Sequence, residues 1–133
     1  MFEVAYNSVI GRYAGASRPS KTLDVTFWVL QLLLAAVFLL AGVTKLAGAQ
    51  MHVETFEKLG VGQWFRYFTG IVEVIAAILI IVPRTVVVGA ALLAATMIAA
   101  IDTHVFFIGG SPVPALVLLA LALLVAWYRG LYR

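Results

Sequence analysis

Four long apolar stretches restrict what this chain can fold into. A helix that crosses a bilayer needs roughly 17–25 mostly apolar residues, because each residue rises about 1.5 Å through about 30 Å of hydrocarbon. Such stretches occupy residues 26–47, 67–82, 85–108 and 113–128. Backbone groups in a bilayer are satisfied only within helices or closed barrels, and these stretches lack the two-residue alternation of barrel strands. The sequence therefore predicts an all-α membrane protein.

The connections between the stretches are short. Only Pro83 and Arg84 separate the second from the third, and the letters GGSP at residues 109–112 separate the third from the fourth. Tight connections place consecutive helices antiparallel, which predicts an antiparallel four-transmembrane-helix bundle over residues 26–128. Residues 1–25 are expected to be a mostly irregular N-terminal tail, with a short interfacial helix near residues 2–13, and residues 129–133 a C-terminal tail. The composition agrees, since 64% of residues are hydrophobic and 11% charged.

The basic residues predict the orientation of the bundle. Six of the nine Lys and Arg residues belong to the two tails and the second connection: Arg12, Arg18, Lys21, Arg84, Arg129 and Arg133. Cytoplasmic segments carry the excess of Lys and Arg, so both termini are expected in the cytoplasm of a cell-membrane protein and residues 48–66 outside. The net charge of +3 therefore reflects membrane orientation, and nucleic acid is not an expected partner.

The expected outer loop and the absence of cysteine add two further expectations. Residues 51–59 interleave apolar and charged side chains, which predicts either a short amphipathic helix on the membrane surface or a lid over the bundle. The chain has no cysteine, which removes disulfide exchange and thiolate metal sites. No metal site is expected, because a b-type haem would need the loop residue His52 to face His104.

Ionisable residues stand inside three of the stretches, although a charge near the bilayer centre costs a few kcal/mol. Glu73 follows Tyr67 by six residues, which places it about 9 Å from the outer end at the helical rise. Asp102 lies at a similar depth in the third stretch, and Lys45 and His104 lie nearer to the same end. We expect these four ionisable groups to converge on the outer third of the bundle.

Helical spacing predicts which of these side chains face inward. Asp102 continues a stripe of small residues formed by Ala91, Ala95 and Ala99, and small residues mark faces where helices approach closely. Asp102 is therefore expected to face inward. His104 lies two residues further on, nearly on the opposite side, so an unbroken helix does not aim both into one pocket.

The expected site follows from these faces. Glu73 and Asp102 are the candidate catalytic residues, where they would handle protons, and the candidate ligand-binding residues are Lys45, His104, Thr69 and Gly70. Each ionisable group also has a structural interpretation. Lys45 would extend to the lipid headgroups, the two carboxyl groups would tie helices together, and His104 would form a hydrogen bond at the edge of a loop.

Two short motifs carry a resemblance to a known membrane family. The letters AGVTKL close the first stretch at residues 41–46, and GIVE opens the second at residues 70–73; Met97, Ala100 and the polar residues 102–104 follow. Over roughly residues 27–128 the chain resembles the DoxX and DoxX-like membrane proteins. The resemblance implies a four-helix membrane protein with Lys45 and Glu73 as its polar pair. It also implies partners, because some relatives are subunits of a thiosulfate:quinone oxidoreductase, others associate with sulfurtransferase and superoxide-detoxifying proteins, and distant ones are assembly chaperones.

Three functions stay open at this point. The first is a small integral membrane subunit of a redox or detoxification complex, enzymatic as part of a quinone-linked oxidoreductase, with a quinone-like lipophilic ligand in the outer pocket. No sequence motif encodes a cofactor. The second is a scaffold or assembly chaperone that docks a partner protein at its outer face. The third is a stand-alone membrane enzyme that acts on a lipid or terpenoid. Small residues on the helix faces also permit a homo-oligomer.

Overall fold

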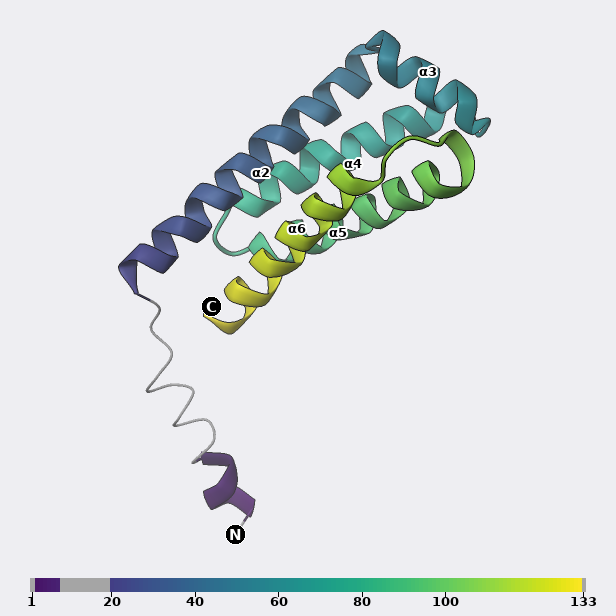
Figure 1. Ribbon diagram of the computed structural model, residues 1–133. Helices are drawn as coiled ribbons and strands as arrows, with labels where there is room; N and C mark the ends of the chain where they lie inside the picture. Colours follow the sequence, from purple (N-terminus) through teal and green to yellow (C-terminus); the bar gives the residue numbers. More distant parts are fainter. Residues whose placement is uncertain (1, 8–19, 133) are drawn as a thin grey trace.

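The computed structural model describes residues 2–7 and 20–132. Residues 2–7 are helical, and the rest of the interfacial helix expected near residues 2–13 lies outside the described residues. The elements that follow are α2 (Lys21–Ala47), α3 (Gln50–Leu59), α4 (Gln63–Ile81), α5 (Val86–Thr103), the π-helical segment η1 (His104–Ile108) and α6 (Val113–Leu131). Figure 1 shows α2, α4, α5 and α6 side by side, with α3 across one end. The predicted all-α four-helix membrane bundle is confirmed.

The four long helices pack in the order α2, α4, α5, α6. Contacts are most extensive between α2 and α4, α5 and α6, and α4 and α5, while α2 and α6 meet along a smaller interface. All four are long and apolar enough to cross a membrane. Large apolar side chains such as Leu33, Leu40 and Ile78 are exposed on the outside of the bundle, where lipid would surround them. The chain is a small integral membrane protein.

The spanning helices extend beyond the apolar stretches. α2 begins at Lys21, five residues before the expected start, because the side chain of Ser20 accepts a hydrogen bond from the Leu23 amide at 3.1 Å and caps the first turn. α4 begins four residues earlier than expected, directly after Gly62, whose φ of 110° ends the preceding loop. A polar first turn lets each of these helices begin several residues before the apolar stretch, where apolar composition alone does not predict a helix.

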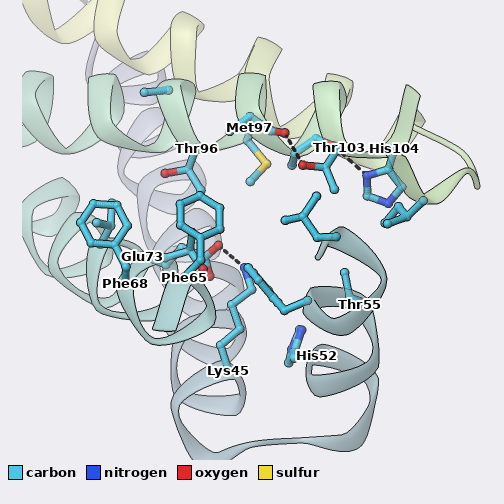
Figure 2. Close-up of a pocket in the computed structure, with 18 of the residues that line it drawn as sticks. Lys45, His52, Thr55, Phe65, Phe68, Glu73, Thr96, Met97, Thr103 and His104 are labelled. Atoms are coloured by element: carbon cyan, nitrogen blue, oxygen red, sulfur yellow. Dashed lines mark hydrogen bonds and ion pairs between the residues drawn. The ribbon is translucent and has the colours of Figure 1, made fainter. Parts of the chain in front are cut away.

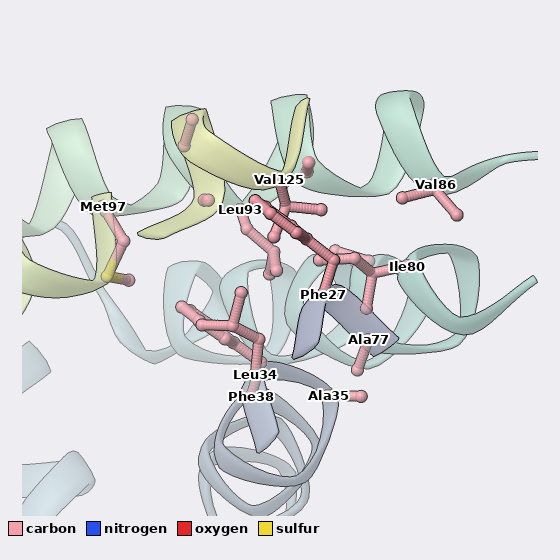
Figure 3. Packing of buried hydrophobic residues seen from close by; sticks show 14 of the residues in the cluster. Phe27, Leu34, Ala35, Phe38, Ala77, Ile80, Val86, Leu93, Met97 and Val125 are labelled. Atoms are coloured by element: carbon pink, nitrogen blue, oxygen red, sulfur yellow. The ribbon is translucent and has the colours of Figure 1, made fainter. Parts of the chain in front are cut away.

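The core lies toward the end of the bundle that carries the chain termini. Figure 3 shows Phe27, Leu34, Ile80, Leu93 and Val125 meeting between the four long helices. The ring of Phe27 also stacks on that of Tyr128, with 3.7 Å between their centroids. Alanines 76, 90 and 122 are fully buried, so the helix backbones approach closely without an empty space between them.

A polar cluster around the buried Gln31 joins α2, α4 and α6 at the termini end. Arg129 donates to Asp24 Oδ1 at 2.5 Å and to Gln31 Oε1 at 2.6 Å, and Gln31 Nε2 donates to the carbonyl of Ile80 at 2.9 Å. Gln31 is fully buried, and this arrangement satisfies both ends of its amide. The cluster holds α6 against α2 at this end of the bundle. The cavity described below lies at the opposite end.

Candidate ligand pocket

A cavity of about 560 Å³ lies at the end of the bundle covered by α3. Its walls come from α3, α4, α5 and η1, and α2 contributes one residue, Lys45. Most of the lining is apolar, and Figure 2 shows Phe65, Phe68 and Met97 among the side chains around it. Ligand pockets in proteins typically have volumes of about 300–1,000 Å³ and are mostly apolar with a few polar groups. The cavity is therefore large enough for the head group of a lipid-sized molecule.

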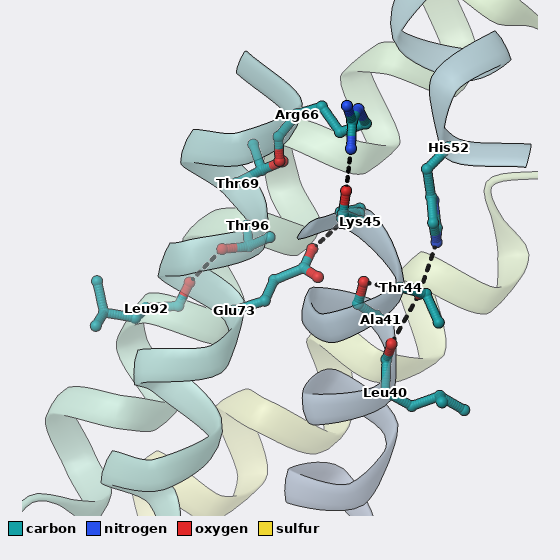
Figure 4. Close-up of polar contacts among 10 residues, drawn as sticks. All are labelled: Leu40, Ala41, Thr44, Lys45, His52, Arg66, Thr69, Glu73, Leu92 and Thr96. Atoms are coloured by element: carbon teal, nitrogen blue, oxygen red, sulfur yellow. Dashed lines mark hydrogen bonds and ion pairs between the residues drawn. The ribbon is translucent and has the colours of Figure 1, made fainter. Parts of the chain in front are cut away.

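An ion pair between two helices lies in this cavity. The ammonium group of Lys45 at the end of α2 donates to Glu73 Oε1 on α4, as Figures 2 and 4 show. The Glu73 side chain is 1% exposed and that of Lys45 is 16% exposed. The second carboxylate oxygen, Oε2, is buried and has no hydrogen-bond partner among the described residues. A buried carboxylate oxygen without a partner is costly, so a ligand that donates a proton to it would be stabilised.

His104 is the ionisable residue that α5 and η1 present to the cavity. Its Nδ1 lies 2.8 Å from the carbonyl oxygen of Ala100. A carbonyl oxygen only accepts hydrogen bonds, so Nδ1 carries a proton, and in the neutral ring Nε2 has a free lone pair. Asp102 is exposed and does not line the cavity, so the expectation that it faces inward was wrong.

The error about Asp102 has a clear physical origin. The buried face of α5 runs through Val86, Ala90, Leu93 and Met97, whereas the Ala91 stripe with which Asp102 was grouped is exposed at the surface. Helix faces in a membrane are apolar on both sides, so small residues alone did not identify the packed one.

His52 holds α3 against the end of α2. The hydroxyl of Thr44 donates its one proton to a backbone carbonyl, with Leu40 O at 2.7 Å. Figure 4 shows the 3.0 Å contact between Thr44 Oγ1 and His52 Nε2, and the imidazole is therefore its donor. Burial, together with the positive charges of Lys45 and Arg66, lowers the pKa of His52. His52 is therefore kept neutral at the roof of the cavity.

The comparisons with known proteins agree with this architecture. The model of the DoxX-like family matches residues 29–128, which include all of α3, α4, α5 and η1 and most of α2 and α6. The chain belongs to the DoxX-like family. No curated protein and no solved structure matches it. The resemblance read from the motifs at residues 41–46 and 70–73 is confirmed.

Of two neighbouring residues that are expected to bind a ligand in this DoxX-like bundle, one lines the cavity and the other does not. Thr69 lines the cavity and donates to the carbonyl of Arg66 at 3.2 Å. Gly70 does not line the cavity, because it packs against α2: a Cβ atom added there would lie 3.1 Å from the carbonyl oxygen of Gly42. Gly70 is thus a point of close helix contact, and its expected contact with a ligand is not supported.

Arg66, expected at the end of the outer loop, is a buried residue that lies next to the DoxX-like site without lining the cavity. It is 5% exposed, its Nε donates to Gln63 Oε1 at 2.7 Å, and its Nη1 donates to the carbonyl of Lys45. It caps the end of α2 from the first turn of α4. Its position after Gly62 and before the aromatic pair Tyr67-Phe68 was the available signal, because that break moves the helix start upstream of Arg66.

The DoxX-like chain shows no obvious metal centre in its described part. Within residues 2–7 and 20–132, no three His, Asp or Glu side chains are grouped so that they could hold a metal ion. His52 and His104 both line the cavity, but each has one ring nitrogen engaged with a protein oxygen. The polar groups of the site are therefore the Lys45–Glu73 pair, His52, His104 and four threonine hydroxyls.

Proposed function

We propose that this chain is the membrane subunit of a redox complex and binds the head of a quinone-class ligand in the cavity beside Lys45 and Glu73. The observation that carries the proposal is the buried, unpartnered Glu73 Oε2 in a largely apolar cavity of about 560 Å³. A polar head with oxygen atoms on an apolar body matches such a site. A bound quinone would supply two-electron, two-proton chemistry, and a partner subunit would exchange electrons with it.

The residues of this chain would bind and orient the head group. Lys45 donates one proton to Glu73 and has two further ammonium protons for a ligand oxygen. His104 presents Nε2, and the aromatic rings of Phe65 and Phe68 provide apolar surfaces for a ring. Glu73 would accept or return a proton at Oε2. These roles support binding and proton handling, and Asp102 has no part in them.

We infer that the cavity opens between α4 and α5, because lining residues on both helices are exposed, and such an opening supports a ligand that arrives from the lipid. Phe68 of α4 and Ala95 and Ala99 of α5 line the cavity and are also exposed at the surface of the bundle. The two alanines leave room on the α5 side of this opening. Because it lies between two spanning helices, a ligand tail would extend from it into the acyl chains.

A variant that blocks this opening with a large side chain tests whether a quinone binds in the cavity. Ala95→Trp would place a bulky side chain at the mouth of the cavity. Ala91→Trp is the matched control, because Ala91 lies one turn away on α5, is exposed and does not line the cavity. The protein, purified in mild detergent, is extracted for quinones and then titrated with a short-chain quinone while tryptophan fluorescence is followed. We expect near-stoichiometric binding in the wild type and Ala91→Trp and about a tenfold weaker affinity in Ala95→Trp.

Two outcomes would contradict the proposal. Absence of saturable binding in the wild type would exclude the quinone site, and equal binding by both tryptophan variants would place the ligand elsewhere. The same purification identifies proteins that are held with the chain. A redox protein at near-stoichiometric level supports the role of a complex subunit, whereas a non-redox client without any quinone would favour the scaffold or assembly chaperone.

A further inference from the structure

The threonine hydroxyls around the cavity have already used their protons. Four threonines line it, and each donates to a backbone carbonyl of its own helix: Thr55 to Met51 at 2.8 Å, Thr69 to Arg66 at 3.2 Å, Thr96 to Leu92 at 2.9 Å and Thr103 to Ala99 at 2.8 Å. A hydroxyl has one proton and two lone pairs. These oxygens therefore present lone pairs to a ligand, and each would have to break its own bond before it could donate.

The imidazole and carboxylate groups of the cavity also offer hydrogen-bond acceptors rather than donors to a ligand. His104 uses its Nδ1 proton on the Ala100 carbonyl and presents the lone pair of Nε2. His52 uses its Nε2 proton on Thr44. Glu73 Oε2 is a buried acceptor without a partner. Among all the residues that line the cavity, Lys45 is thus the one whose side chain has protons to spare.

This excess of acceptors discriminates between oxygen-bearing head groups. A hydroxyl group accepts from the Lys45 ammonium and donates to Glu73 Oε2 at the same time, so it satisfies both members of the pair. A carbonyl oxygen can only accept hydrogen bonds, so it leaves Glu73 Oε2 without a partner. Its lone pairs also repel those of the acceptor atoms that line the cavity. A buried acceptor without a partner is costly, so the carbonyl form is expected to bind more weakly.

We infer that the cavity recognises a hydroxyl head group and therefore holds the quinol form of its ligand more tightly than the quinone. This inference rests on the proposed function and specifies which redox form the site selects. A complex with this subunit would be built to take quinol from the membrane, or to retain the quinol that it forms. The shared chemistry is a lipophilic hydroxyl, which an aromatic quinol or an aliphatic terpenoid alcohol would supply.

Ligands matched in ring and tail test the inference on the full chain in lipid nanodiscs. The set contains a short-chain quinol kept reduced under anaerobic conditions, its quinone, its dimethyl ether and an aliphatic prenyl alcohol with the same tail. Binding is measured by quenching of tryptophan fluorescence. We expect the quinol to bind about tenfold more tightly than the quinone, and the ether, which can only accept, to bind as weakly as the quinone.

The outcomes separate this inference from the proposed function. Quinone binding that equals or exceeds quinol binding would overturn the inference and leave the quinone site standing. Absence of saturable binding by any ligand in the set would overturn both. Tight binding of the prenyl alcohol together with weak binding of the quinol would support hydroxyl recognition, identify a lipid alcohol as the ligand and overturn the quinone-class proposal.

Two variants test the atoms that carry the inference. Thr96→Val removes a lone-pair acceptor, and Thr26→Val is its matched control, since Thr26 donates to the carbonyl of Thr22 in the same way far from the cavity. Glu73→Gln introduces an N–H donor that suits a carbonyl oxygen. The ratio of quinol to quinone affinity should fall about threefold in Thr96→Val, fall further in Glu73→Gln and stay constant in Thr26→Val. An unchanged ratio in Thr96→Val and Glu73→Gln would overturn the inference.

Discussion

Gly42 of α2 lies against Gly70 of α4 so closely that a Cβ atom on Gly42 would stand 2.8 Å from the Gly70 carbonyl oxygen. Lys45 follows Gly42 by three residues, and Glu73 follows Gly70 by three. Residues three apart lie on the same face of a helix. The contact between the two glycines therefore directs Lys45 and Glu73 toward each other, and the two family motifs describe one structural unit.

Substitution of Gly42 by Ala should weaken the bundle and disturb the ion pair. The added methyl group would lie too close to the backbone of α4, which cannot move aside without separating the helices. Overpacking of this kind costs about 1–3 kcal/mol. Thermal unfolding in detergent micelles should show a lower Tm for Gly42→Ala. Gly130→Ala is the control, because nothing lies within 4 Å of the added atom. Equal Tm values for both variants would contradict close packing at Gly42.

The Lys45–Glu73 pair should be more costly to break than to replace. Lys45→Met leaves the carboxylate of Glu73, which is 1% exposed, without its cation. Removal of one partner of a buried ion pair typically destabilises a protein by about 3–5 kcal/mol, whereas replacement of both by apolar residues is often neutral. The double variant with Lys45→Met and Glu73→Met should therefore recover most of the lost stability. The free energy of unfolding in mixed micelles measures this, and a double variant no more stable than Lys45→Met would argue against a coupled pair.

The sequence predicts the parts of this protein that depend on local pattern. Apolar length is enough to locate four spanning helices, and the depth of Glu73 is enough to mark it as unusual. Lys45 and Glu73 are brought together by glycines whose spacing is visible in the motifs at residues 41–46 and 70–73. These predictions need only helical geometry.

The remaining features depend on contacts between distant segments. His52 lines the cavity because α3 folds back on Thr44, and Arg66 is buried next to it because α4 begins before Arg66. Neither the position of α3 nor the start of α4 can be predicted from the spacing of apolar residues within one helix. A stripe of small residues predicts that Asp102 faces inward, yet the packed face of α5 runs through Ala90, Leu93 and Met97. Packing against α4 and α6 decides that phase.

The stability of the DoxX-like bundle should fall as the pH falls below the ordinary pKa of His52. Burial and the nearby cations Lys45 and Arg66 lower its pKa in the folded state from 6.5, so the unfolded chain binds the proton more readily. The stabilising contribution is complete above about pH 6.5, and is lost progressively as the pH falls from there to the folded pKa. Thermal unfolding at pH 8, 6.5 and 5 should show this loss.

His52→Gln identifies the group responsible for the loss. Glutamine keeps an N–H donor for Thr44 but does not titrate, so the Tm should vary less with pH between 8 and 5 than in the wild type. The comparison is made in a His104→Gln background, because His104 is the other histidine of the chain. If the His104→Gln protein loses the same amount of stability between pH 8 and 5 with His52 present as with His52→Gln, the titration of His52 is not the cause of the loss.

The orientation of the bundle can be tested directly because the chain has no cysteine of its own. Lys21 begins α2 at the termini end, and Glu57 lies on α3 at the opposite end; both are exposed. The excess of Lys and Arg at the termini end predicts that this end is cytoplasmic. A membrane-impermeant maleimide added to intact cells should label Glu57→Cys, and should label Lys21→Cys only after permeabilisation. The reverse pattern would invert the orientation, and labelling of both variants in intact cells would contradict a bundle whose two ends lie on opposite sides of the membrane.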